Sequence, residues 1–493
     1  MPRRIAPIAV VAAAVAAVVA ATLAWWWMTS NRYPPPPVPE GLAAATTTAA
    51  PLIRDAVRLV ESRPGDAEAR YHLALVYEAN DDPTRARTSL EQAILLAPDA
   101  PPAWYHLALV HEHFGALDEA IAAMERVVEL APGYAPAHRH LGQWRLDQNR
   151  IGDAEKAFQR ALAANPRDVE AAVGMARIEV ERNDDAAALA RLEAIVNGSD
   201  PPGAGAFQLY GTILRRAGRL AEAGAAFARA RADAPQTFDP WRDQLEPLRA
   251  SLDGQLAYAR KLLLRGRVAD ALTLLESLYR EYPESASAAI DLAVARRALG
   301  NLDGSMALLE DAVAAFPESS NAHYNYALTR FMLSHRPDGT IDPAGLADVD
   351  AHVATAIATN PSSPLPRALQ GDLHTALGEN RAAAACYQQA AVADPANPSW
   401  PYQAGLALLR AGDAPGALTA LSSALALSPR RPEIMVALAE ALRASGRADE
   451  AASMLAAARR QSSRRPEPAG PESLPPLPWG ANSSGFAPAG NRQ

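Results

Sequence analysis

The chain has 493 residues, of which 49% are hydrophobic and only 6% aromatic, and its formal net charge is −8. A negative net charge gives no reason to expect nucleic acid as a partner. The single cysteine, Cys386, excludes a disulfide framework and a CxxC metal or haem site.

The N-terminus carries an apolar run, residues 5–28, which follows two arginines and ends in three tryptophans and a methionine. Such a run is long enough to cross a hydrocarbon core of about 30 Å as a helix, and the tryptophans fit an aromatic belt at the far interface. The arginines predict that residue 1 lies in the cytoplasm. We therefore expect residues 1–30 to be a cytoplasmic N-terminus and transmembrane signal-anchor that contacts the lipid bilayer. The protein would then be a single-pass inner (plasma) membrane protein, with the rest of the chain periplasmic or extracytoplasmic; a cleaved signal peptide is the alternative.

Residues 31–50 are rich in proline and small residues, and we expect them to form a linker. Pro34–Pro37 predicts a short, stiff polyproline II rod. Its simplest role is a stalk that separates the following part of the chain from the bilayer. The next stretch, residues 52–63, predicts a lone helix in front of the first full repeat.

From residue 67 on, the chain repeats with a period of 34 residues. Large apolar residues recur at helical spacing within each copy, which predicts two amphipathic helices. A small residue in the first helix and an alanine in the second let the two helices approach closely. A proline ends each clear copy, at Pro98, Pro132 and Pro166. One helix pair cannot bury its apolar face alone, so stacked neighbours must cover it.

This residue order resembles the tetratricopeptide repeat (TPR). The resemblance implies an all-α fold, namely a TPR α-solenoid that winds as a right-handed superhelix of helix-turn-helix units, here with an N-terminal transmembrane helix. Extra residues break the period twice, between two arrays and inside the second array. The predicted parts are a first TPR array at 51–235, an added helix or hinge at 236–251, a second array at 252–460 with an inserted loop at 334–343, and a disordered Pro-rich tail at 461–493.

The sequence contains no Gly-x-Ser-x-Gly elbow and no Walker-type phosphate loop. His72, His106 and His140 recur at one repeat position, which raises the possibility of a metal ladder. Neighbouring helices lie about 8–10 Å apart, whereas zinc ligands must converge to about 2 Å from the ion. We therefore expect no enzyme activity, no cofactor, no metal and no small-molecule substrate.

The resemblance implies that the first helices of successive repeats line a groove that holds protein or peptide partners. Tyrosines at such positions give anchors with a low entropy cost, and a basic stripe in the middle of the chain can hold an acidic segment or a C-terminal carboxylate. A solvated face is the alternative interpretation of the stripe. The partner-binding residues that we expect are Tyr71, Tyr105, Arg139, Arg215, Arg216, Arg260, Arg297, Tyr324 and Tyr402.

These features favour a membrane-anchored TPR scaffold or adaptor that binds protein or peptide partners in the cell envelope and assembles or tethers a complex. The alternative is a non-catalytic accessory subunit of an envelope enzyme system, for polysaccharide synthesis and export or for cytochrome c maturation. In that case the catalyst resides on another chain.

Overall fold

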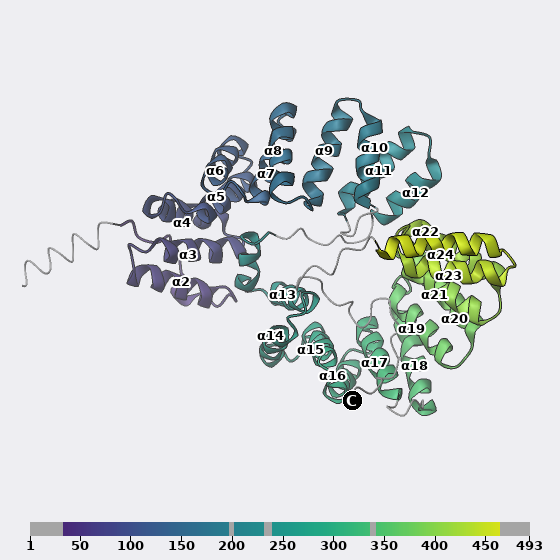
Figure 1. The fold of residues 1–493 in the computed structure, drawn as a ribbon. Coiled ribbons are helices and arrows are strands. Elements are labelled where there is room, and N and C mark those ends of the chain that lie inside the picture. The colour runs from purple at the N-terminus through teal and green to yellow at the C-terminus, as the bar shows by residue number, and fades with distance from the viewer. Residues whose placement is uncertain (1–32, 197–201, 231–238, 336–341, 464–493) are drawn as a thin grey trace, which may run out of the picture. The chain divides into compact units, whose positions relative to one another are not determined.

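The computed structural model describes residues 33–196, 202–230, 239–335 and 342–463. Its elements are helices, which follow one another in antiparallel pairs joined by short turns (Figure 1). Within the described ranges there are eleven such pairs, from α3–α4 to α23–α24, preceded by the 3-10 helix η1 (Leu42–Ala44) and by α2 (Ala50–Ser62). The predicted all-α repeat fold is confirmed.

The helix bounds follow the 34-residue period closely. The pairs before the break in the period are α3 (Ala67–Ala79) with α4 (Pro83–Leu96), α5 (Pro101–His113) with α6 (Leu117–Leu130), α7 (Ala135–Asp147) with α8 (Ile151–Ala164), α9 (Val169–Glu181) with α10 (Asp185–Val196), and α11 (Ala204–Arg216) with α12 (Leu220–Arg229).

After the break comes the 3-10 helix η2 (Arg242–Leu248), and the pairs then resume. They are α13 (Leu252–Leu264) with α14 (Val268–Glu281), α15 (Ala286–Ala298) with α16 (Leu302–Ala315), α17 (Ser320–Ser334) with α18 (Pro343–Thr359), α19 (Pro364–Ala376) with α20 (Asn380–Ala393), α21 (Ser399–Arg410) with α22 (Ala414–Leu427), and α23 (Pro432–Ala444) with α24 (Ala448–Ser463).

The turn inside a typical pair depends on one residue with left-handed backbone conformation. That residue has φ of 72° at Gly115 and 58° at Asn149, and each is the second residue after the end of the first helix of its pair. Glycine and asparagine adopt this conformation at the lowest cost, and it ends a helix by turning the chain back. The second helix can therefore begin within a few residues and lie against the first.

The close approach within a pair depends on the small residue of the first helix. A Cβ atom added to Gly142 would lie 2.6 Å from Cδ1 of Phe158, and one added to Gly174 would lie 2.4 Å from Cζ of the same ring. The ring is buried and fills the space that the two glycines leave. The same relation joins Gly211 to Phe227 and Gly371 to Tyr387. In each of these three pairs the aromatic residue stands sixteen positions after the glycine of its own pair.

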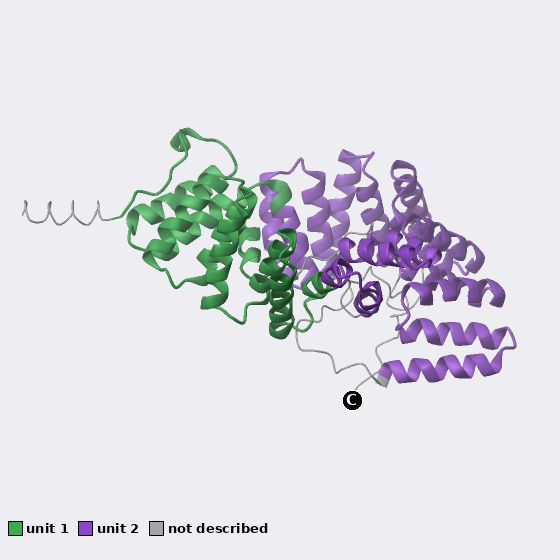
Figure 2. Cartoon of the chain, turned by 90° about the horizontal axis from the view of Figure 1, so that it is seen from above, with its two compact units in different colours: residues 1–175, 237–254 green, residues 176–236, 255–493 purple. Residues whose placement is uncertain are grey.

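The chain forms two compact units, coloured separately in Figure 2. One contains residues 1–175 and 237–254, and the other contains residues 176–236 and 255–493. The segment around η2, predicted as an added helix or hinge, belongs by its contacts to the first unit. This segment interrupts the series of repeats in the sequence, but it packs against repeats that precede it by a hundred residues or more.

The Pro-rich segment in front of the repeats is held against the first repeat. The Arg70 guanidinium donates to the carbonyl of Pro34 at 2.8 Å, Gln92 Nε2 donates to Pro35 at 3.1 Å, and the Tyr77 hydroxyl donates to Pro37. The segment expected as a stalk is therefore tied to the first repeat at Pro34–Pro37, because the carbonyls of a polyproline segment are good acceptors for buried donors of α3 and α4.

Three expectations concern parts of the chain outside the described residues. These are the transmembrane signal-anchor at residues 1–30, the centre of the inserted loop between α17 and α18, and all but the first residues of the Pro-rich tail. Among the helices that the structure describes, none is both long enough and apolar enough to cross a membrane.

Candidate functional site

The candidate site is built on the first helices of the first three repeats in the first unit. Its residues come from α3, α5, α7 and the positions at their ends, and we call this surface the first-helix face. It consists of Tyr71, Leu75, Asn80, Tyr105, His106, Tyr134, Arg139 and His140. Successive first helices present the same side of each repeat, so side chains spaced about 34 residues apart come together.

A segment of the same chain lies on this face. Residues 239–250 include η2, and we call them the docked segment. Side chains at its start, middle and end each contact the face, and the contacts run from α7 and α5 at the start to α3 at the end. The face therefore holds one short, largely 3-10 helical segment in a fixed direction.

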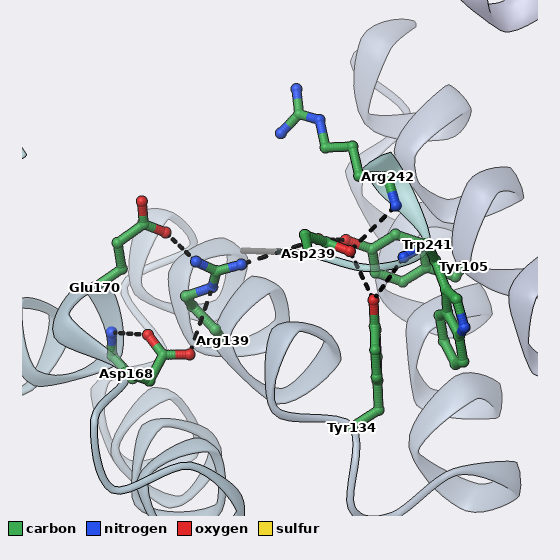
Figure 3. A network of polar contacts seen from close by, with 9 residues as sticks. Tyr105, Tyr134, Arg139, Asp168, Glu170, Asp239, Trp241 and Arg242 are labelled. Carbon is green, nitrogen blue, oxygen red and sulfur yellow. Dashed lines mark hydrogen bonds and ion pairs between the residues drawn. The ribbon is translucent and has the colours of Figure 1, made fainter. Parts of the chain in front are cut away.

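The start of the docked segment is fixed by one carboxylate (Figure 3). Asp239 is buried and accepts hydrogen bonds from the hydroxyls of Tyr105 and Tyr134, the second at 2.6 Å. Its Oδ1 also accepts from the backbone N–H of Arg242 at 3.2 Å, and Arg139 Nη2 lies 4.0 Å from its Oδ2. A buried carboxylate is stable only with such donors around it.

Arg139 is itself held by acidic neighbours. Its guanidinium pairs with Glu170, and its Nε lies 3.9 Å from Asp168, whose carboxylate caps the start of α9 through the N–H of Ala171. Figure 3 shows the guanidinium between these carboxylates and Asp239. Because its side chain is almost fully buried, Arg139 serves as a fixed positive charge behind the Asp239 position.

Trp241 is the aromatic anchor of the docked segment. Its ring stacks on Tyr134 with a centroid separation of 3.7 Å and meets Tyr105 edge-on at 5.4 Å. The backbone carbonyl of Trp241 lies 3.2 Å from His106 Nε2, and Glu78 orients this imidazole through its Nδ1 at 2.9 Å. Aromatic pairs in these geometries contribute about 0.5–1.5 kcal/mol beyond the area they bury.

The second half of the docked segment combines one apolar contact with polar contacts to α3. Leu245 is buried in a small cluster with Leu75 and Ala79. The Tyr71 hydroxyl donates to Gln244 Oε1 at 3.0 Å. Asn80 bonds the segment backbone twice, donating to the carbonyl of Leu248 and accepting from the N–H of Ala250, both at 2.9 Å. Because a side-chain amide carries both donors and an acceptor, Asn80 can bond a backbone C=O and a backbone N–H of the segment at the same time.

Burial and hydrogen bonding set the charge states on this face. Burial alone raises the pKa of Asp239, but the hydrogen bonds from Tyr105 and Tyr134 outweigh it and leave the pKa below its usual value. Burial, reinforced by Asp239, raises the pKa of both tyrosines. Desolvation, with the charge of Arg139 beside it, lowers the pKa of His140 to about 3. At neutral pH the face thus presents two neutral hydroxyl donors to an ionised carboxylate.

Three of the residues expected to bind partners come together here. Tyr71, Tyr105 and Arg139 all contact or face the docked segment. The sequence signal for them was the fifth position of each repeat, which the resemblance places on the inner side of the first helices. In the described residues these side chains meet a part of their own chain.

The other six expected residues lie in the second unit and do not form one cluster there. Arg215 lies over the Phe227 ring and Arg216 pairs with Asp185. Arg297 is buried, where it donates to Thr329 and to Asn325 Oδ1 at 2.8 and 2.9 Å. The remaining residues are the half-exposed Arg260, paired with Asp291, and the partly buried tyrosines Tyr324 and Tyr402, which pack against the apolar core.

Several residues of the site were not predicted from the sequence. The repeat position of His106 suggests only a metal ligand, and no sequence motif points to Asn80, Tyr134 or Asp239. The sequence signal for the docked segment is the break in the repeat period. Regular repeats need no extra residues between them, so the inserted tryptophan and aspartate indicate another role. Trp241 marks that break, but nothing in the sequence shows which earlier repeats it contacts.

The Arg260–Asp291 pair in the second unit predicts a pH effect. Asp291 is buried beside Arg260 Nε at 2.8 Å, and burial raises its pKa to about 6 despite this partner. A carboxyl whose pKa is higher in the folded state than in the unfolded state lowers stability as pH rises from about 4 to about 6. Asp291→Asn should remove that decline, a gain of up to about 3 kcal/mol at pH 7.

The measurement is urea unfolding between pH 4 and pH 7. Asp55→Asn is the control, because Asp55 is an exposed carboxylate of α2. An Asp291→Asn variant that follows the pH profile of the unaltered chain would contradict the assignment.

Within the described ranges, no group of three or more histidine, cysteine, aspartate or glutamate side chains could hold a metal ion. Cys386 is buried in α20, and its thiol lies 3.6 Å from Gln370 Oε1. The candidate site therefore combines converging hydroxyl donors, an aromatic stack and a small apolar cluster along one segment.

The fold defines the class of helical repeat proteins built from stacked helix pairs. Family models described as "Tetratricopeptide repeat" match residues 74–135, 145–201, 262–330, 368–429 and 408–469, which together exceed half of the chain. The chain belongs to the tetratricopeptide repeat family. The resemblance seen in the sequence is confirmed as far as the repeats are concerned.

One curated relative is the cellulose synthase 1 operon protein C of Komagataeibacter xylinus, which is 27% identical over 164 residues. The match spans 33% of this chain and only 10% of that protein.

Solved structures with the same repeats include a thermophilic TPR protein of Thermus thermophilus (23% identity, 39% of this chain and 100% of that chain, TM-score 0.34). Another is yeast Tom70 (12% identity, 80% and 92%, TM-score 0.35). These likenesses add nothing to the family assignment.

Proposed function

We propose that this protein is a non-catalytic scaffold or adaptor whose TPR arrays bind protein or peptide partners. The observation that carries the proposal is the docked segment on the first-helix face. A segment that is mostly a 3-10 helix lies there, held by a carboxylate clamp, an aromatic stack, an apolar contact and backbone hydrogen bonds. These are the interactions by which peptide-binding domains gain affinity and direction.

We further propose that the scaffold works in the cell envelope. The apolar run at residues 5–28 would anchor it in the inner membrane with the repeats on the periplasmic side. Alkaline extraction of membranes, with an enzyme reporter fused after residue 50, tests this proposal. Release of the full-length chain by alkali, or a reporter that is active only in the cytoplasm, would contradict it.

The second candidate function is an accessory subunit of an envelope enzyme system. The relative encoded in a cellulose synthase operon favours polysaccharide synthesis or export over cytochrome c maturation. In this case the partner would be another protein of that system. The experiment below distinguishes the two candidates, because it identifies the partner.

The test is a pull-down from crosslinked membranes of the native host. We expect Tyr71→Ala/Tyr105→Ala or Arg215→Glu/Arg216→Glu to lose a discrete envelope protein that the unaltered chain retains. Arg126→Ala is the control, because this exposed arginine of the second helix α6 pairs only with its neighbour Glu129 in the described structure. Circular dichroism must show that each variant is folded. If no protein depends on either pair of residues, the scaffold proposal loses its support.

A further inference from the structure

The docked segment is an unusual addition to a repeat array. Fourteen residues beyond one period separate the prolines that close the fifth and sixth repeats, and the docked segment falls within that insertion. Stacking needs no such insertion, because each helix pair is covered by its neighbours. The docked segment instead contacts three successive repeats along its length, as a bound ligand would.

The polar groups of the face match the polar groups of the docked segment. The hydroxyls of Tyr105 and Tyr134 converge on one carboxylate, and Arg139 lies behind it. Tyr105 is fully buried, so without a carboxylate at this position its hydroxyl would lose its acceptor in a water-poor site. Glu78 orients His106 toward a backbone carbonyl rather than toward a side chain. These positions select an aspartate and recognise the backbone of the residues that follow it.

The docked segment itself gives the spacing of the recognised groups. Its aspartate is followed by an aromatic ring two residues later and by a leucine four residues after that, as Asp239, Trp241 and Leu245 show. Between these anchors, Pro240, Arg242 and Gln244 are exposed and Asp243 is partly exposed. Three anchors with exposed residues between them define a short linear motif of the form Asp-x-aromatic-x-x-x-Leu.

We propose that the first-helix face is a binding site for a partner peptide with this Asp-x-aromatic-x-x-x-Leu chemistry, and that residues 239–250 are its internal occupant. The proposal rests on the scaffold function proposed above and names the ligand of that same surface. A tethered occupant acts at an effective concentration of about 1 mM. A partner peptide therefore binds the unaltered chain only if it displaces this tethered occupant. That requires high affinity or several linked binding sites, so only tight or multivalent ligands can use the site.

The experiment uses the full chain with its occupant disabled, Asp239→Ala/Trp241→Ala/Leu245→Ala, which leaves every residue of the face in place. The probe is a fluorescein-labelled peptide with the sequence of residues 237–251, followed by fluorescence anisotropy. We expect this variant to bind the peptide at least about 100-fold more tightly than the unaltered chain does. A peptide in which the aspartate and the tryptophan are replaced by alanine should not bind.

A second variant shows that binding occurs on the face. Adding Tyr105→Phe/Tyr134→Phe to the occupant-disabled chain keeps both rings and removes the two hydroxyls. These hydroxyls donate to the aspartate, and that of Tyr134 also accepts from the backbone N–H of Trp241 at 3.2 Å, so binding should fall by at least about tenfold. Adding Tyr326→Phe instead removes a tyrosine–aspartate hydrogen bond of the second unit and should leave binding unchanged.

A third measurement covers the case in which the occupant-disabled chain does not fold. The unaltered chain is mixed with excess peptide that carries a photoreactive leucine analogue at the position of Leu245. Crosslinks to α3, around Leu75 and Ala79, are expected. No crosslink to α3, or no peptide binding by a folded occupant-disabled chain, overturns the proposal and makes the docked segment a permanent part of the first unit.

The two proposals fail separately. If the peptide does not bind but the pull-down still yields a partner that depends on Arg215 and Arg216, the scaffold function stands and its ligand lies elsewhere. If the peptide binds but no variant loses a partner, the face is a peptide site and the scaffold function lacks support.

Discussion

Phe158→Ala is expected to lower the free energy of unfolding by about 3–5 kcal/mol. The ring is 1% exposed and occupies the space left by Gly142 on one side and Gly174 on the other. Neither glycine has a side chain that could move into the cavity, and the two helices that carry them are held by their own repeats. The cost should therefore be at the upper end for a phenylalanine, because it depends on how far a site can collapse.

Urea unfolding followed by far-ultraviolet circular dichroism measures this loss, and hydrogen exchange in α7, α8 and α9 shows where it falls. Phe114→Ala is the matched control. That ring is 44% exposed at the end of α5, where the Arg87 guanidinium lies 5.2 Å from its centroid. Its removal should cost less than about 1 kcal/mol. Equal costs for the two substitutions would show that Phe158 does not fill the space between the repeats.

Arg70→Ala is expected to cost about 3 kcal/mol or more. The guanidinium is 1% exposed and donates to the carbonyls of Pro34 and Pro64, each at 2.8 Å, and to the Gln92 side chain. Burial lowers the pKa of Arg70, so the charge is held at a desolvation cost that these acceptors must offset. Each hydrogen bond from a charged donor contributes about 1.5 kcal/mol or more, and the carbonyls left behind lose a buried partner.

The same substitution should also release the Pro-rich segment from the first repeat. Deuterium uptake in peptides covering residues 38–49 reports this release, alongside the unfolding midpoint. Arg58→Ala provides the comparison, because its side chain is 72% exposed and only pairs with Asp55 on the same helix. That variant should remain within about 0.5 kcal/mol of the unaltered chain. If Arg70→Ala behaves like Arg58→Ala, the segment is not tied down by the guanidinium.

Both predictions concern contacts on which the candidate site depends. Phe158 supports α7, which carries Arg139 and His140 and begins just after Tyr134. Arg70 lies next to Tyr71 on α3, so its loss should also disturb the end of the face that holds Gln244 and Leu248. Peptide binding measured on these variants would show how far the site depends on the stability of the repeats beneath it.

The sequence alone determined the helix pairs and their packing. The 34-residue period and the small residue of the first helix are local signals, because the residues that they bring together are at most a few tens of positions apart. The relation of Gly142 to Phe158, sixteen positions on, can be read from the sequence as compensation of volume within one pair. Repeated signals of this kind reinforce one another, so the family assignment followed from the residues.

Only the tertiary structure decided what lies on the first-helix face. The hydrogen bonds of Asp239 to Tyr134 and Tyr105 span 105 and 134 residues, and that of Tyr71 to Gln244 spans 173. The repeat period does not predict such contacts. They depend on which of several similar repeats a single non-repeating segment packs against. The contacts of Pro34–Pro37 depend on the tertiary structure for the same reason: the stiffness of a polyproline segment is local, whereas the donors that bind it, Arg70, Tyr77 and Gln92, come together only in the folded repeat.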